Sequence, residues 1–146
     1  MRISIRARYA LRASLALAKM GSSDTLISIN ALSEAEGISP VFLEQIFFRM
    51  RNAGILRSVR GPGGGFCFSQ PLDKLTVKTI LEAAGEDFSL TYCDKTHDEC
   101  DRIGTCVSHT VWQGVSDMYD KYLDTLTISS LLEEQSAAKK HRRQAK

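Results

Sequence analysis

The sequence predicts a mainly α-helical fold in which a winged helix-turn-helix precedes a cysteine-bearing loop and a long helix. Three observations predict it. Two short helical segments flank a turn that contains Gly37, a glycine-rich loop at 61–65 separates two short apolar segments, and a long segment with one apolar edge follows closely spaced cysteines. The 146 residues, 43% of them hydrophobic and 25% charged, are enough to bury a core.

Charge is distributed unevenly along the chain. Residues 1–60 carry nine Lys and Arg against four Asp and Glu, residues 61–134 carry five against thirteen, and residues 135–146 carry five against none, for a net charge of +2. A basic amino-terminal half suits the phosphate backbone of DNA, although a solvated helix surface would account for the same charges.

The amino-terminal residues indicate the cell compartment. Their arginines superficially resemble a transit peptide, but they suit the first helix of the domain equally well. The sequence contains no secretory signal and no run of about eighteen apolar residues. We therefore expect a cytoplasmic protein, in which cysteines bind metal or act in redox chemistry rather than form disulfides.

Residues 4–20 are predicted to form an amphipathic helix that ends at Gly21, because their apolar residues recur at helical spacing. Ser14 falls on the apolar side, where we expect its hydroxyl to bond to a carbonyl one turn earlier. Four arginines lie beside this stripe or at its edge, where they can meet solvent or phosphate: Arg2, Arg6, Arg8 and Arg12.

The helix-turn-helix is predicted at Ile29–Glu36 and Pro40–Ala53. Ser28 and Ser39 are suitable N-caps, and Pro40 takes the first helical position, where a missing N–H costs nothing. On the second helix, one sector of about 100° is apolar and is expected to be buried: Leu43, Ile46, Phe47 and Met50.

The opposite face of this second helix mixes polar and apolar side chains. Glutamine can bond to adenine, glutamate can accept from cytosine N4, and apolar groups can contact the thymine methyl. A polar surface with two apolar exceptions is the alternative interpretation. The residues of this face are Val41, Glu44, Gln45, Phe48 and Asn52.

A β-hairpin is predicted from two strands, 55–60 and 66–69, joined by the loop Gly61-Pro62-Gly63-Gly64-Gly65; Leu26 and Ile27 form a further very short strand. Glycines let the backbone approach a groove closely, and Arg60 supplies charge. A phosphate-binding loop is the alternative, but no helix opens directly after these glycines. Cys67, in the returning strand, is predicted to be a small buried hydrophobe.

Three cysteines and a histidine form a candidate metal site, because Cys93, Cys100, Cys106 and His109 are separated by six, five and two residues. Thiolates and a neutral imidazole suit zinc, copper or an iron–sulfur cluster. Structural zinc sites usually take ligands in close pairs, and here only Cys106 and His109 are paired. His97, inside the first gap, is a competing ligand.

The remaining segments are predicted to be helical. Thr76 caps a helix through Ala84, and a long helix runs from Val107 to Leu123. The apolar edge of the long helix is wider than one small module can cover, so we expect burial against a partner; an ordinary core stripe is the alternative. A short final helix ends at Glu134, and the basic tail 135–146 is expected to be disordered. The residues of the apolar edge are Val107, Val111, Trp112, Val115, Met118, Tyr119, Tyr122, Leu123 and Leu126.

Over nearly all of residues 1–134 the chain resembles the IscR type of winged-helix iron–sulfur transcription regulators. The resemblance rests on Arg6 to Ala10 with Tyr9, on Leu43-Glu44-Gln45, on Ser58-Val59-Arg60-Gly61-Pro62-Gly63-Gly64-Gly65, and on Cys106-Val-Ser-His109-Thr-Val-Trp112. It implies a homodimer that binds a double-stranded DNA operator and holds one 2Fe–2S cluster per subunit through Cys93, Cys100, Cys106 and His109.

The organisation expected on this basis has four parts: a DNA-binding domain at 1–85, a cluster-binding loop at 86–106, a dimerisation helix and short final helix at 107–134, and the basic tail. The expected function is transcription regulation that senses cluster or redox status. The residues expected to contact DNA are Arg2, Arg6, Tyr9, Val41, Glu44, Gln45, Phe48, Arg60, Gly61, Gly63 and Gly64.

Two departures from the IscR pattern keep alternatives open. The first cysteine gap is one residue longer than usual, and Val41 stands where IscR carries a small polar residue. The related nitric-oxide sensors, NsrR, commonly lack the histidine and can draw an acidic ligand from the first helix, where this chain has Arg8. A zinc-bound or metal-free regulator is a further alternative. No catalytic constellation is recognisable, so we expect no enzyme.

Overall fold

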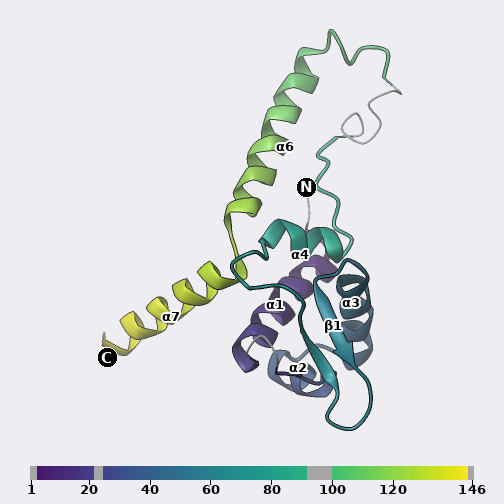
Figure 1. Cartoon of the computed structure of the whole chain (residues 1–146). Helices are drawn as coiled ribbons and strands as arrows, with labels where there is room; N and C mark the ends of the chain where they lie inside the picture. Colours follow the sequence, from purple (N-terminus) through teal and green to yellow (C-terminus); the bar gives the residue numbers. More distant parts are fainter. Residues whose placement is uncertain (1–2, 22–24, 92–99, 145–146) are drawn as a thin grey trace.

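The helices and strands follow the order predicted from the sequence. The computed structural model describes residues 3–21, 25–91 and 100–144. A head of four helices and a hairpin carries a long helix that projects away from it (Figure 1). The elements are α1 (Ile5–Met20), α2 (Ile29–Glu36), α3 (Pro40–Asn52), β1 (Leu56–Val59), β2 (Gly65–Phe68), α4 (Val77–Ala83), α6 (Val107–Thr125) and α7 (Ile128–Gln144).

Hydroxyl side chains fix the starts of the four head helices. In each case the hydroxyl accepts a hydrogen bond from the backbone N–H three residues later, at 3.1–3.2 Å, which satisfies one of the helix's unpaired donors. Between α2 and α3, Gly37 has φ 64°, a left-handed conformation that few other residues adopt. The capping residues are Ser4, Ser28, Ser39 and Thr76, of which the last three were predicted.

The hairpin is a two-stranded antiparallel sheet whose register pairs Leu56 with Phe68 and Val59 with Gly65. The strand expected at 26–27 is a single bridged residue: Ile27 donates to the Phe66 carbonyl at 3.0 Å, and the Phe66 N–H donates back at 2.8 Å. This bridge passes so close to Gly65 that a Cβ built there lies 2.5 Å from the Ile27 carbonyl oxygen. The absence of a side chain at Gly65 therefore lets the hairpin dock on the head.

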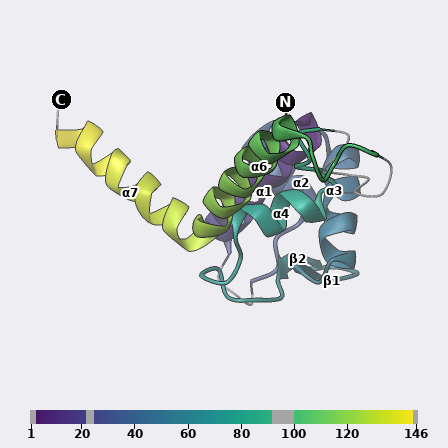
Figure 2. The ribbon, with the colours of Figure 1, turned by 90° about the horizontal axis from the view of Figure 1, so that it is seen from above.

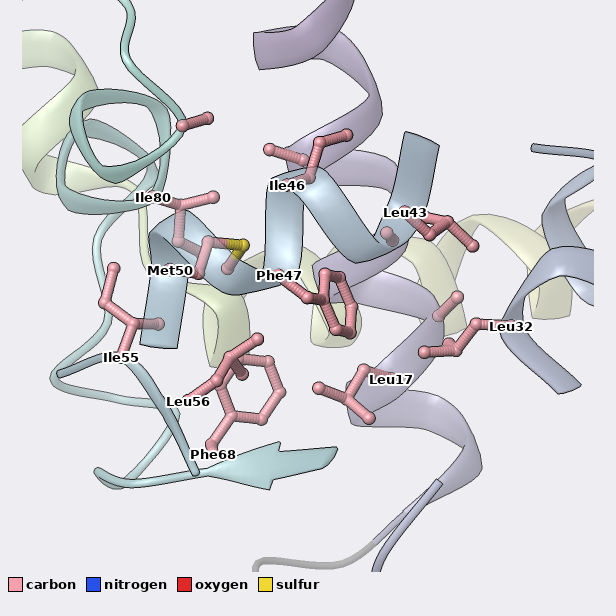
Figure 3. Close-up of a cluster of buried hydrophobic side chains, with 14 of the residues drawn as sticks. Leu17, Leu32, Leu43, Ile46, Phe47, Met50, Ile55, Leu56, Phe68 and Ile80 are labelled. Carbon is pink, nitrogen blue, oxygen red and sulfur yellow. The ribbon is translucent and has the colours of Figure 1, made fainter. Parts of the chain in front are cut away.

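The core is built around α3 (Figure 3). The four side chains predicted to be buried, Leu43, Ile46, Phe47 and Met50, are all fully buried. They pack with residues from every other part of the head, and Phe47 meets the Phe66 ring edge-on at a centroid distance of 5.2 Å. Their partners include Leu17, Leu32, Ile55, Leu56, Phe68 and Ile80.

Ser14 departs from the prediction. Its side chain is fully buried, and its hydroxyl oxygen makes no hydrogen bond in the part of the chain that the structure describes. The expected bond to a carbonyl of the preceding turn is absent, so that prediction is wrong. Ser14 shares the buried side of α1 with small apolar residues, including Ala10 and Ala13.

Among the described residues, the packing contacts and bonds of the long helix α6 with the head lie near its carboxyl end. Leu123 packs with Ala7, Val77 and Leu81, and Lys78 of α4 forms an ion pair with Asp120 at 2.9 Å. Backbone bonds reinforce this junction: the Val77 N–H donates to the Leu126 carbonyl at 2.8 Å, and the Ile128 N–H to the Leu75 carbonyl at 2.9 Å. The other end of α6, where the cysteine loop joins it, stands away from the head (Figure 1).

The final helix corrects the expectation of a short helix and a disordered tail. Helix α7 does not stop at Glu134 but continues to Gln144, pointing away from the head on the side opposite α3 (Figure 2). Residues 135–144 are mostly Ala, Lys, Arg and Gln, which are strong helix formers and extend a helix already begun. None of the described helices is long and apolar enough to cross a membrane.

Gly65→Ala tests the docking of the hairpin. The new methyl group would meet the backbone of Ile27, which cannot move without breaking the bridge, so we expect the free energy of unfolding to fall by about 1–3 kcal/mol. Thermal unfolding followed by circular dichroism measures the change. Gly104→Ala is the control, because a Cβ there meets nothing within 4 Å; equal melting temperatures for the two variants would contradict this description of the bridge.

Candidate nucleic-acid interface and cysteine-bearing loop

The exposed face of α3 carries the residues that the helical spacing predicted for it. Val41 and Phe48 are 65% and 54% exposed although both are apolar, and Glu44 and Gln45 between them are exposed too. These side chains line a shallow hollow that also receives Arg6 from α1. Burial of the opposite face of α3 determines which residues point outward. The hollow is lined by Arg6, Val41, Glu44, Gln45, Phe48, Arg49 and Asn52.

Arg49 is a residue of this hollow that the sequence analysis missed. It lies one turn after Gln45, so the four-residue helical spacing could have placed it on the same face. Its guanidinium Nη1 lies 3.1 Å from the position of a Cβ built on Gly85, and the Nη1 of Arg6 lies 3.4 Å from the same position. Two positively charged groups from different helices therefore converge beside Gly85.

Tyr9 belongs to the packing between the first three helices. Its ring meets Phe42 edge-on at 5.7 Å between centroids, and the guanidinium carbon of Arg12 lies 5.4 Å from the Tyr9 ring centroid. Arg12 in turn forms a 3.0 Å ion pair with Glu36 and donates to its carbonyl at 2.7 Å. Tyr9 is half-buried, and its contact with DNA stays a prediction. Arg2, the other predicted DNA contact near the start of the chain, lies outside the described residues.

The hairpin loop has the backbone shape that its glycines suggest. Gly61 and Gly63 have φ of 98° and 73°, and the Gly64 N–H donates to the Gly61 carbonyl at 2.9 Å. A Cβ on Gly64 would lie 2.8 Å from that same carbonyl oxygen. Arg60 is exposed at the edge of this loop. The loop is tight, and only glycine fits several of its positions.

Arg51, which the sequence analysis also missed, links α3 to the hairpin. Its guanidinium carbon lies 5.2 Å from the Phe48 ring centroid, and its Nη1 donates to the Ser58 hydroxyl at 3.4 Å. The three-residue spacing between Phe48 and Arg51 was the available signal, since such residues are neighbours on a helix. The contact holds the exposed Phe48 ring in place.

The structure describes three of the four candidate ligands of the cysteine site. Cys100 is exposed, Cys106 is the N-cap of α6, and His109 lies in the first turn, where its backbone N–H donates to the Cys106 carbonyl at 3.1 Å. Cys93 and His97 lie outside the described residues. Within the described ranges no three His, Cys, Asp or Glu side chains form a metal site. The ligand set therefore stays a prediction.

Cys67 lies apart from this loop, as predicted. It is 2% exposed in β2, where it pairs with Arg57 of β1, and it takes part in the sheet rather than in the cysteine-bearing segment. Its burial agrees with the interpretation of a small hydrophobe.

The space between α4 and α6 is acidic, in contrast to the α3 hollow. Burial, followed by the charge of Glu86, raises the pKa of Tyr119, whose ring meets Phe88 edge-on at 5.5 Å. The hydrogen bond from Lys78 to Asp120 raises the pKa of Lys78. Such a surface repels phosphate, so the two faces are electrostatically distinct. The carboxylates lining this space are Glu82, Glu86, Asp87, Asp117 and Asp120.

The fold and the exposed α3 face define a winged helix-turn-helix transcriptional regulator. The chain belongs to the Rrf2 family, described as an iron-dependent transcriptional regulator, which matches residues 3–134. It is 33% identical to the HTH-type transcriptional regulator IscR of Yersinia pseudotuberculosis over 135 residues, which cover 92% of this chain and 81% of that protein. These relatives are regulators rather than enzymes.

Solved structures share the architecture. The T. potens IscR superposes with a TM-score of 0.75 at 26% identity, covering 94% of this chain and 90% of that one. CymR of B. subtilis, called a global cysteine regulator, also has a TM-score of 0.75, at 24% identity over 92% of this chain and 98% of that one. The predicted winged helix-turn-helix fold is confirmed.

Proposed function

We propose that the protein regulates transcription by binding operator DNA as a homodimer and that it senses cluster or redox status through a 2Fe–2S cluster. The observation that carries the sensing proposal is the start of α6. Cys106 and His109 lie one helical turn apart there, and exposed Cys100 precedes Cys106 by six positions. Cys93 would complete a set of three thiolates and one imidazole, a ligand set suited to an iron–sulfur cluster.

The described ligands fit such a cluster. Cys106 makes no side-chain capping bond, so its sulfur is not committed to the helix, and the first turn of α6 contains no acidic residue. A helix N-terminus carries partial positive charge, which favours thiolates and the anionic group they would hold. When bound, the cluster would supply one-electron redox chemistry and sensitivity to oxidants; Cys100, Cys106 and His109 would hold and orient it.

Other family members limit what the fold alone implies. CymR, with the same fold, is called a global cysteine regulator, so the signal has to be inferred from the site rather than from the architecture. Presence of His109 and of Arg8 at the first-helix position favours an IscR-like over an NsrR-like sensor. A zinc-bound or metal-free regulator is the alternative that metal analysis separates.

Anaerobic purification tests the cluster. We expect a coloured protein with iron and acid-labile sulfide in equal amounts, because three thiolates and an imidazole suit a 2Fe–2S core. His109→Ala should weaken or alter the absorption spectrum, whereas Cys67→Ala should leave it unchanged, since Cys67 is buried in the hairpin. Stoichiometric zinc without sulfide, after growth with ample iron, would refute the proposal.

The exposed edge of α6 supports the dimer. Six large apolar side chains line the part of α6 that the head does not cover, and Met118 is 73% exposed. Exposed apolar area of this extent is unfavourable in water and marks a surface that another protein covers. Two-fold pairing would bury the same edge of both copies. The six residues are Val107, Val111, Trp112, Val115, Met118 and Tyr122.

Met118→Asp tests this pairing. A carboxylate on the apolar edge would lose most of its hydration in the dimer, so we expect the variant to be monomeric at micromolar concentration in analytical ultracentrifugation. Asp117→Lys is the control, because it changes charge at an exposed position of the same helix that is already polar. An unchanged dimer in Met118→Asp, or a monomeric wild type, would exclude α6 as the interface.

DNA contacts are proposed to divide between two elements. The hairpin loop, through Arg60 and the amides of Gly61 and Gly63, would supply affinity that tolerates sequence changes. The Gly64 N–H is already bonded to the Gly61 carbonyl, so Gly64 would allow a close approach of the backbone instead. The face of α3 would choose bases through Glu44 and Gln45, with Val41 and Phe48 against thymine methyl groups. Glu44 is repelled by phosphates, so it must find a donor such as cytosine N4 or lower the affinity.

Titrations of two variants on several operators test this division. We expect Glu44→Ala to strengthen binding to formerly poor sites, because the repulsive carboxylate is gone. Arg60→Ala should weaken all sites similarly and reduce the salt slope by about one. A uniform loss of affinity in Glu44→Ala would show that the carboxylate does not choose between sites.

A further inference from the structure

Two arginines of the α3 hollow, Arg6 and Arg49, make no ion pair with the residues that the structure describes. The Nη1 atoms of Arg6 and Arg49 lie within 3.4 Å of the same built Cβ position on Gly85, so the two guanidinium groups are close neighbours. Neither forms a hydrogen bond or ion pair with any residue that the structure describes. Like charges held close together destabilise the protein unless an anion binds between them.

The surroundings hold both arginines in place. Glu86, the residue after Gly85, accepts hydrogen bonds from the Ser4 N–H through both carboxylate oxygens, at 3.2 and 3.3 Å. Ser4 caps α1 two residues before Arg6, so this contact fixes the start of the helix that carries Arg6. Arg49 projects from α3, whose opposite face is fully buried. The pair is therefore positioned by rigid elements rather than by a mobile loop.

The position of the pair indicates which anion it binds. Arg49 lies near the carboxyl end of α3, whereas the base-contacting candidates Val41, Glu44 and Gln45 lie in its first half. In helix-turn-helix proteins the amino-terminal part of the recognition helix meets base edges, and neighbouring segments meet the backbone. Guanidinium groups match a phosphate geometrically and bind it through two parallel hydrogen bonds.

We propose that Arg6 and Arg49 together bind one phosphate group of the DNA backbone and so set the position of α3 in the major groove. The proposal rests on the proposed DNA-binding function and adds two residues acting on one phosphate to it. Glu44 lines the same hollow, so a phosphate between the arginines would also keep backbone charge at a fixed place relative to this carboxylate.

Titrations of the full chain on several duplexes over a range of salt concentrations test the pair. We expect Arg6→Ala and Arg49→Ala each to lower the affinity for every duplex about tenfold. Each should also reduce the slope of log affinity against log salt concentration by about one. Because both residues would contact one phosphate, the double variant should lose less than the product of the two single losses. Arg49→Lys, which keeps the charge, should retain most of the salt slope.

Lys19→Ala is the control for removing one positive charge, because Lys19 is exposed beside α7 rather than at the hollow. Losses confined to particular duplexes, or a double loss equal to the product of the single ones, would overturn the shared phosphate. If Arg49→Ala binds like Lys19→Ala while wild type binds DNA, only the phosphate site fails. Wild type that binds no duplex would overturn the proposed function itself.

A free anion is the other source of a phosphate group. Inorganic phosphate, added at constant ionic strength without DNA, should raise the melting temperature of wild type by no more than it raises that of Arg49→Ala. A phosphate-dependent stabilisation that Arg49→Ala abolishes, with DNA affinity unchanged in that variant, would assign the pair to a free anion and overturn the proposal.

Discussion

Burial of one face of α3 is the constraint on which the rest of the head depends. Leu43, Ile46, Phe47 and Met50 have no exposed surface, and they contact side chains from α1, α2, α4 and the hairpin. A helix held this way cannot rotate without opening the core. Its other face is therefore presented at a fixed angle, and exposed Val41 and Phe48 follow from that angle rather than from any local preference.

The hairpin and the hollow are positioned by the same constraint. Phe66 of β2 contacts Phe47 edge-on and pairs with Ile27 through two backbone bonds. These contacts fix the position of the hairpin relative to α3. Arg51 crosses from the Phe48 ring to Ser58 of β1. On the other flank, Gly85 lies against Arg6 and Arg49 and is followed directly by the segment that leads toward the cysteine loop.

Local chemistry made much of the fold predictable. Ser28, Ser39 and Thr76 cap their helices as expected, and the 3.6-residue spacing separated the two faces of α3. Local signals failed where tertiary packing or chain extension decides. The hydroxyl of Ser14 found no partner in the described structure. Helix α7 continued beyond Glu134 because it extends a helix already begun, although its basic, polar composition had suggested disorder.

The candidate site was predictable to a different extent in its two parts. Side chains on one helix, such as Val41 and Glu44, follow from spacing, but the convergence of Arg6 and Arg49 depends on how α1 packs beside α3 and the end of α4. Sequence spacing alone does not report such a contact. For the cysteine site, the residue types and their order support a ligand set, while the position of Cys93 lies outside the described residues.

Selection from a random pool of DNA duplexes tests the central claim most directly, with the anaerobically purified protein in both cluster-loaded and cluster-free form. The account predicts an enriched motif with two-fold symmetry, whose half-sites are spaced by one helical turn or a multiple of it, since paired α6 helices would present two α3 faces symmetrically. It also predicts that the preferred motif or its affinity changes between the two forms. A pool with no enriched motif, or identical motifs bound equally by both forms, would contradict the account.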